Sequence, residues 1–310
     1  MKLFLTVVGT LCLVGIIQAQ STPTIAQSQS TVSLNVAGNL SLALTAINQT
    51  INLINTTINT TDTATLTAVT RWRNYTVGNL TALVNRFQNY SGVIGSAVLS
   101  LNNSISSLTS ASSSAQALLF GTDTYTLPNL FNTVWQLANT TGNTVLQAAY
   151  NLSSYATCAN NVSLVCLRKY GANLTAAPIL LTRFNDCLTP EITKIANIGT
   201  NITIQINNDM IVSQSFYSLI QLCNIPTVAA MNSTNYQTTP SVNCLNTFLT
   251  QIASQQSIQS LNYGLSSLMW APLQTITFRV NRCVQMVQGD IQDTVTRVNA
   301  AFSNCLVTGK

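Results

Sequence analysis

Apolar residues recur every three or four positions along much of the chain, which is the spacing of one face of an α-helix. Two early runs show it most clearly: Ile47, Ile51, Ile54 and Ile58, and then Val98, Leu101, Ile105 and Leu108. Between them the stripe continues, with a phase slip near Gly78, through Val69, Trp72, Leu80, Leu83 and Phe87. We therefore predict one long interrupted helix, or two helices folded back on each other. Asparagine and threonine are mediocre helix formers, so burial against a partner helix has to offset their propensity.

A second helical region is predicted from about residue 133 onward. Pro190 followed by Glu191, with Thr189 as a cap, is typical of a helix start, and Pro226 should end that helix. Its expected inward face comprises Ile192, Ile195, Gly199, Ile202, Ile206, Met210, Ser213, Phe216, Ile220 and Cys223. After Pro272 the rhythm returns at Leu273, Ile276, Val280, Cys283, Val287, Ile291, Val298, Phe302 and Cys305. The Ser/Ala-rich stretch 104–116, followed by Gly121 and Pro128, indicates a loop or linker.

These patterns predict an all-α protein. A long-helix bundle or coiled-coil-like N-terminal region (20–110) is followed by a loop or linker (111–132) and a disulfide-stapled, cysteine-containing helical domain (133–310). Residues 1–19 have the layout of a signal peptide, because Lys2 precedes an apolar stretch that ends at Ala19. No later stretch reaches the 18 or so apolar residues of a transmembrane segment. We expect a secreted, extracellular protein.

Composition fits export. Charged residues make up 6% of the chain, whereas ordinary soluble domains carry about 25%. Asparagine and threonine fill the polar positions, and many lie in Asn-x-Ser/Thr sequons, whose sugars are bulky and hydrated. The predicted glycosylation sites are Asn39, Asn48, Asn55, Asn59, Asn74, Asn79, Asn89, Asn102, Asn139, Asn151, Asn161, Asn173, Asn201 and Asn232. An Asn/Thr-rich chain also produces sequons by chance, so some of these sites should be unused.

Cysteine usage supports the same compartment. Cys12 lies in the predicted signal peptide, which leaves Cys158, Cys166, Cys187, Cys223, Cys244, Cys283 and Cys305. In an oxidising environment most should pair, and one is left over. If the last helix is continuous, Cys283 and Cys305 lie about 33 Å apart and cannot bond to each other, because a disulfide needs Cα atoms within about 7 Å. Each should therefore reach a neighbouring helix, although the pairing stays open.

The residues needed for common catalytic mechanisms are scarce. The chain has no histidine, which removes the usual general base and the commonest metal ligand. Asp290 and Asp293 lie one turn apart, but a solvated face explains them better than a glycosidase pair. Trp72 is best interpreted as a core residue between the solvated Arg71 and Arg73. We predict no enzyme and no catalytic, cofactor-binding or metal site.

The sequons are unevenly placed. Thirteen of the fourteen lie at or before Asn201, and asparagines beyond Asn232 lie outside the motif. We predict that this sugar-free C-terminal part meets a protein or glycan partner in the extracellular space, because a glycan would block contact; the alternative is that these residues are interior. The dispersed positive charge argues against nucleic acid, which needs a dense basic patch. The leftover thiol or the apolar stripes could also join copies into a disulfide-linked or helical homo-oligomer.

The signal peptide, the sequon-rich helical N-terminal half and the cysteines from Cys158 to Cys305 resemble secreted insect glycoproteins of the TsetseEP-domain family, named after a tsetse midgut protein. The resemblance implies a gut-lumen or body-fluid protein, and no site residue carries over. The favoured function is a non-catalytic glycoprotein with a structural, protective or binding role at an epithelial surface or in a body fluid. The alternative is a carrier of apolar ligands in a helical-bundle cavity.

Overall fold

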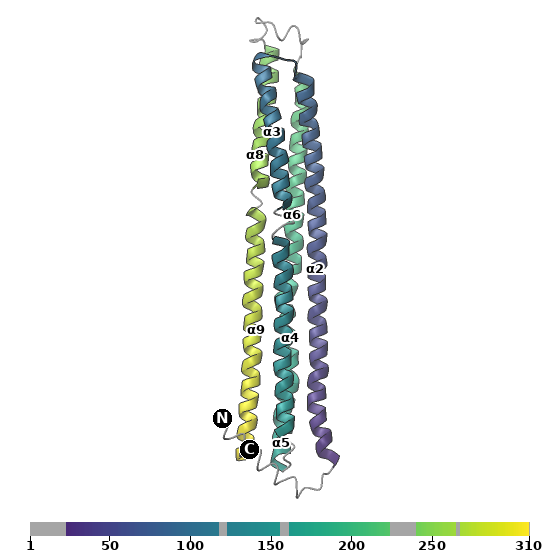
Figure 1. Cartoon of the computed structure of the whole chain (residues 1–310), viewed down its shortest axis with the longest axis vertical. Helices are drawn as coiled ribbons and strands as arrows, with labels where there is room; N and C mark the ends of the chain where they lie inside the picture. Colours follow the sequence, from purple (N-terminus) through teal and green to yellow (C-terminus); the bar gives the residue numbers. More distant parts are fainter. Residues whose placement is uncertain (1–22, 118–122, 156–160, 224–239, 265–266, 310) are drawn as a thin grey trace. The chain divides into compact units, whose positions relative to one another are not determined.

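The computed structural model describes residues 23–117, 123–155, 161–223, 240–264 and 267–309, and within these ranges it is helical and contains no strand (Figure 1). The elements are α2 (Pro23–Phe87), α3 (Gly92–Ala117), α4 (Asp123–Tyr155), α5 (Asn161–Leu181), α6 (Arg183–Leu219), η2 (Ile220–Leu222), α8 (Pro240–Gly264) and α9 (Ser267–Thr308). The all-α prediction is confirmed. The predicted signal peptide, Cys158 and Asn232 lie outside the described residues.

The chain divides into two compact units that each take segments from distant parts of the sequence. Unit 1 comprises residues 1–54, 129–192 and 276–310, and unit 2 comprises residues 55–128 and 193–275. Helices α2 and α6 contribute one part to each unit. The predicted division into consecutive N-terminal and C-terminal regions is therefore wrong, because the helices are long enough to supply packing faces to both units.

The long helix α2 keeps one face buried by repeating its apolar positions every eleven residues. One row comprises Val36, Ile47, Ile58, Val69 and Leu80, and a second comprises Ala43, Ile54, Thr65, Thr76 and Phe87; all ten are buried. Eleven residues over three turns give about 3.67 per turn, close to the 3.6 of a straight helix. The same face therefore stays directed inward along the helix.

The predicted interruption near Gly78 is absent. Gly78 lies inside α2, and nothing would lie within 4 Å of a Cβ added there. The phase is kept because Val69 and Leu80 are separated by one eleven-residue repeat. The chain folds back only after Phe87, where Gly92 begins α3 with a φ of 65°, a conformation that glycine adopts at little cost.

Hydroxyl side chains are accommodated in these helices by bonding back to their own backbone. Thr45, Thr60, Thr133 and Thr294 each donate to the carbonyl four residues earlier at 2.8–2.9 Å, and Ser104 does so at 3.0 Å. This satisfies the hydroxyl without ending the helix. It explains how a chain rich in residues of modest helix propensity remains helical.

Unit 1 packs the first part of α2 with α4, α5, the start of α6 and most of α9. A Cβ on Gly142 of α4 would overlap a terminal methyl of Leu40 on α2, so only glycine fits this approach without a shift. On α5, Gly171 lies against Val32 of α2, and the Asn39 amide of α2 donates to the Thr175 carbonyl at 3.2 Å. Small residues and one interhelical hydrogen bond thus bring α4 and α5 close to α2.

Unit 2 has a core shared by the second part of α2 with α3, α6, η2 and α8. Trp72, Phe87, Leu101, Ile220 and Leu245 lie in one buried cluster. The Ser104 hydroxyl of α3 lies within hydrogen-bond distance of the Ala253 carbonyl of α8 at 3.3 Å, so its single proton is shared with the Ser100 carbonyl. The sequence prediction that Trp72 is a core residue is confirmed, since its side chain is fully buried.

The predicted loop or linker at 111–132 is wrong over most of its length. Helix α3 extends to Ala117 and α4 begins at Asp123, so only residues 118–122 of this stretch lie outside the described part. Alanine is the best helix former, and α3 serines such as Ser96 and Ser100 bond to carbonyls four residues earlier. Pro128 lies in the second turn of α4, where the packing of the buried Leu127 and Leu130 offsets the one backbone hydrogen bond that proline removes.

The predicted helix start at Pro190 is also wrong, because α6 begins at Arg183 and continues through it. An interior proline costs about 3 kcal/mol, since it removes one backbone hydrogen bond and crowds the preceding turn. Here that preceding turn is anchored by the buried Phe184, Cys187 and Leu188. Tertiary packing therefore overrides the local signal. At the other end, α6 passes into η2 and Cys223 is extended, so the helix ends before Pro226 as predicted.

Candidate interaction surface

Most of the described sequon asparagines lie on the surface. Ten are exposed: Asn48, Asn59, Asn74, Asn89, Asn102, Asn139, Asn151, Asn161, Asn173 and Asn201. They lie on α2 to α6 and on the turn between α2 and α3, whereas neither α8 nor α9 carries a sequon. Sugars at these ten positions would not have to displace packed side chains.

Three sequon asparagines are half-buried and engaged with the fold. The Asn39 amide nitrogen, the atom that would carry a sugar, donates to the Thr175 carbonyl. The Asn79 amide nitrogen donates to the Tyr75 carbonyl at 2.9 Å. The side-chain oxygen of Asn55 is buried without a hydrogen bond. Folding therefore distinguishes these three positions from the exposed ones, a difference that the motif alone does not show.

All six cysteines in the described ranges are paired. In unit 1, Cys166 of α5 bonds to Cys305 of α9, and Cys187 of α6 bonds to Cys283 of α9. In unit 2, Cys223 bonds to Cys244 of α8. The expectation that Cys283 and Cys305 each reach a neighbouring helix is confirmed. Cys158, the seventh cysteine beyond the predicted signal peptide, lies outside the described residues, so the leftover thiol stays a prediction.

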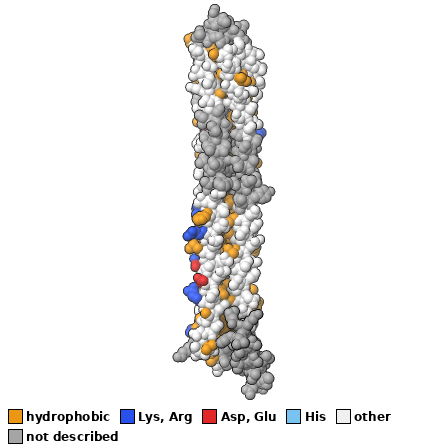
Figure 2. Space-filling view, turned by 60° about the vertical axis from the view of Figure 1, so that its left-hand side comes forward, with side chains coloured by type: hydrophobic (Ala, Val, Ile, Leu, Met, Phe, Trp, Pro, Cys, Tyr) orange, Lys and Arg blue, Asp and Glu red, His pale blue; other side chains and the backbone are white. Residues whose placement is uncertain are grey.

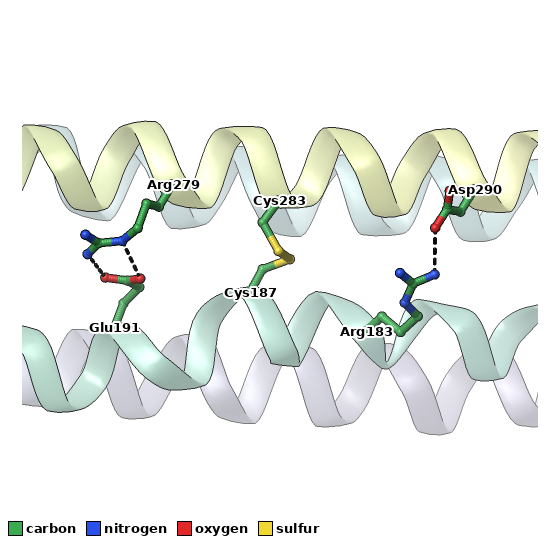
Figure 3. The surroundings of a disulfide bond; sticks show 6 residues. All are labelled: Arg183, Cys187, Glu191, Arg279, Cys283 and Asp290. Carbon is green, nitrogen blue, oxygen red and sulfur yellow. Dashed lines mark hydrogen bonds and ion pairs between the residues drawn. A yellow bond between two sulfur atoms is a disulfide. The ribbon is translucent and has the colours of Figure 1, made fainter.

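The contact between α6 and α9 combines a disulfide with two ion pairs, as Figure 3 shows. On one side of Cys187–Cys283, Arg279 binds both carboxylate oxygens of Glu191, at 2.7 and 3.1 Å. The Glu191 side chain is only 4% exposed, and its hydrogen bonds raise the pKa of Arg279. On the other side, Arg183 donates to Asp290 at 2.7 Å, with both side chains largely in solvent. This contact, which we call the α6–α9 seam, fixes α9 at three successive points.

The acidic residues singled out in the sequence do not come together as a free carboxylate pair or cluster within the described ranges. The seam engages Asp290 with Arg183, so Asp290 and Asp293 are not a free carboxylate pair. Within the described ranges, no three metal-ligating side chains of the His, Cys, Asp and Glu types cluster. Asp62 is half-buried on α2 without a hydrogen bond or ion pair there, and burial raises its pKa to about 6.

Two hollows on unit 1 are open to solvent. One, of about 360 Å³, lies between α2 and α4 and includes Leu40 and the half-buried Trp135. The other, of about 430 Å³, lies between α5 and α9 and includes Tyr170, Asn173 and Arg297. Because both are surface grooves, neither encloses a ligand as a carrier cavity would.

The outward face of α9 in unit 1 carries side chains that the apolar-stripe analysis overlooked. Phe278 and Met286 are large, apolar and exposed, and Arg282 lies between them. The space-filling view in Figure 2 shows few charged side chains, and most of those visible lie along one edge among hydrophobic ones. The sequence signal that could have found this face is the set of apolar residues that fall outside the buried register.

No helix in the described ranges is long and apolar enough to cross a membrane. Comparison with protein-family models, curated proteins and solved structures found no match for this chain. The resemblance to the TsetseEP-domain family therefore stays a prediction.

Proposed function

We propose that this protein is a non-catalytic, secreted glycoprotein with a structural, protective or binding role at an epithelial surface or in a body fluid. The observation that carries the proposal is the position of the sequons, since ten of the thirteen described sequon asparagines are exposed. A chain with 6% charged residues needs another hydrated surface group, and N-linked sugars supply one.

The disulfides support the same proposal. Two of the three in the described ranges join helices that are far apart in sequence, Cys166–Cys305 across 139 residues and Cys187–Cys283 across 96. Such bonds persist in oxidising, extracellular compartments. Cross-linked helices open less readily, and proteases cleave mainly opened chain, so sulfur and sugar would both protect the protein in a protease-rich fluid.

The test begins with secretion of the full chain from insect or mammalian cells. We expect the protein in the medium, with a mass that falls on enzymatic removal of N-linked sugars and with six described cysteines unreactive toward alkylation until reduction. The deglycosylated protein should be digested faster by a broad-specificity protease than a mock-treated sample. Retention in the cytosol, unglycosylated and with reduced thiols, would overturn the proposal.

The same preparation distinguishes the carrier alternative. Lipid extraction followed by mass spectrometry should yield no apolar compound in stoichiometric amount if the role is structural or protective, and both hollows described on unit 1 are open grooves. One bound molecule per chain would instead favour the carrier.

A further inference from the structure

Six residues form a stripe along the outward face of α9: Phe278, Arg282, Met286, Gly289, Asp293 and Arg297. At 100° per residue they fall within an arc of roughly 100°, over about 28 Å of helix. Phe278 is 64% exposed and Met286 is 65% exposed. Arg282, Asp293 and Arg297 are exposed as well, and all six residues lie in unit 1. We call this set the α9 stripe.

Packing within the described chain explains neither the glycine nor the exposed apolar residues of the stripe. Glycine inside a helix costs about 1 kcal/mol relative to alanine. A Cβ added to Gly289 would have no described atom within 4 Å, in contrast to Gly142 and Gly171, which pack against α2. Gly289 therefore leaves a shallow depression that the described fold does not fill.

Two charged groups of the stripe are also unused. In the described ranges, the side chains of Arg282 and Asp293 take part in no hydrogen bond or ion pair. Their neighbours Arg279 and Asp290, by contrast, are bound in the α6–α9 seam. The Arg297 Nε donates to the Asp293 backbone carbonyl at 3.3 Å, which leaves its two terminal amino groups available.

The spacing between successive residues of the α9 stripe is the same in both directions along the helix. The successive steps are four, four, three, four and four residues, with a midpoint between Met286 and Gly289. Two antiparallel copies of α9 related by a twofold axis at that midpoint would each meet the other in matching pairs. Met286 would lie over the depression at Gly289 of the second copy, and Arg282 would lie beside Asp293 of the second copy. At each end, Phe278 would meet the guanidinium of Arg297, a favourable cation–π contact.

We propose that the α9 stripe binds a second copy of this chain in a twofold-symmetric, antiparallel dimer. A self-complementary patch is what such an interface requires. The stripe carries no sequon, and Cys187–Cys283 together with Arg279–Glu191 hold the backbone behind Arg282 in place. Because the stripe is short compared with stable interfaces, which bury about 1,200–2,000 Å², we expect a weak dimer populated at micromolar concentrations.

The decisive test is a charge swap between two variants of the full secreted chain. Arg282→Asp places an aspartate opposite Asp293, and Asp293→Arg places an arginine opposite Arg282. Each variant alone should dimerise at least tenfold more weakly than the natural chain in sedimentation-velocity concentration series. An equimolar mixture should regain the dimer, because both contacts become attractive in the heterodimer. Arg168→Asp, which changes an exposed arginine on α5 by the same charge, should leave the dimer unchanged.

A second variant tests the contact at the midpoint. Gly289→Leu should fill the depression and weaken the dimer at least tenfold, while its helical circular dichroism and unfolding midpoint are retained or raised, because open space surrounds the added side chain. The natural sugars are kept in these experiments, since Asn173 lines the same hollow as Arg297, the residue at one end of the stripe. A chain that stays monomeric throughout the series, or single variants whose mixture does not recover, would overturn the proposal.

Discussion

Arg279 and Arg183 both join α6 to α9, yet their removal should have very different effects on stability. Arg279→Ala would leave the Glu191 carboxylate, 4% exposed, without the two hydrogen bonds that it now accepts at 2.7 and 3.1 Å. Removing one partner of a buried ion pair costs about 3–5 kcal/mol. Arg183→Ala removes one contact from an Asp290 side chain that is 55% exposed and can turn to water. Such surface pairs contribute about 0–1 kcal/mol.

The difference can be measured by guanidinium denaturation of the disulfide-intact chain, followed by circular dichroism at neutral pH. We expect Arg279→Ala to lower the free energy of unfolding by at least about 2 kcal/mol more than Arg183→Ala. The double variant Arg279→Met with Glu191→Leu removes both charges from the buried pair and should lose less than Arg279→Ala alone. Equal losses for the two single arginine variants would refute the assignment of Glu191 as a buried charge that depends on Arg279.

Three further predictions follow from other parts of the molecule. Burial raises the pKa of Asp62 from 3.8 to about 6, so the folded chain holds this proton more tightly than the unfolded chain. Its contribution to stability should be full below about pH 4 and lost as pH rises through about 6, and Asp62→Asn should remove this component from denaturation midpoints measured across that range. Peptide mapping of the secreted protein should find higher sugar occupancy at Asn48 and Asn139 than at the half-buried Asn39 and Asn55; equal occupancy would mean that the fold does not influence modification. Replacing both cysteines of Cys166–Cys305 with serine should lower the free energy of unfolding by about 5 kcal/mol in the chain-entropy model, against about 3 kcal/mol for Cys223–Cys244. The difference arises because the sequence separations are 139 and 21 residues. A larger loss for Cys223–Cys244 in denaturation would contradict that model here.

The helical faces could be predicted from the sequence because their period is local. Ile47, Ile54 and Ile58 on α2, and Leu101 and Leu108 on α3, are buried as their spacing indicates. The same holds for Val280, Val287 and Phe302 on α9. A stripe of this kind requires only that some partner covers it, so the prediction holds whichever helix supplies the cover.

The partners of each helix could not be predicted, because pairing depends on residues far apart in the chain. Cys166 reaches Cys305 across 139 residues, and no local pattern selects this partner. Local stop signals failed for a related reason. Pro190 lies inside α6 because the buried turn before it and the seam to α9 outweigh the lost backbone hydrogen bond. The Ser/Ala-rich stretch fails as a linker signal because alanine favours helix and serine can bond back to the backbone.

The candidate interaction surface includes the exposed sequon asparagines and the charged side chains near α9. Only the sequons could be predicted from sequence motifs. The sequons were found directly, but separating exposed Asn48 from half-buried Asn55 required knowing which way each face of α2 points. The sequence also showed that the C-terminal part lacks sequons, since thirteen of the fourteen lie at or before Asn201. The pairing of Arg279 with Glu191 was not visible, since 88 residues separate them.

Asp62 and Gly289 depart in opposite ways from the residue types expected at buried and exposed helix positions. In α2, Asp62 falls in the register of the buried Leu40 and Ile51, at successive eleven-residue steps, and its burial disfavours the charged form. In α9, Gly289 weakens a long helix although no described neighbour needs its small size, as is also true of Gly38 and Gly78 in α2. Departures of this kind are expected at functional or strained positions. The depression at Gly289 faces outward beside an exposed methionine and two unused charges, so the proposed second copy would account for it, whereas the cost at Asp62 is internal. If Gly289→Leu raises the unfolding midpoint and leaves association unchanged, Gly289 has no role in assembly. Its cost to the helix would then be internal, as it is at Asp62.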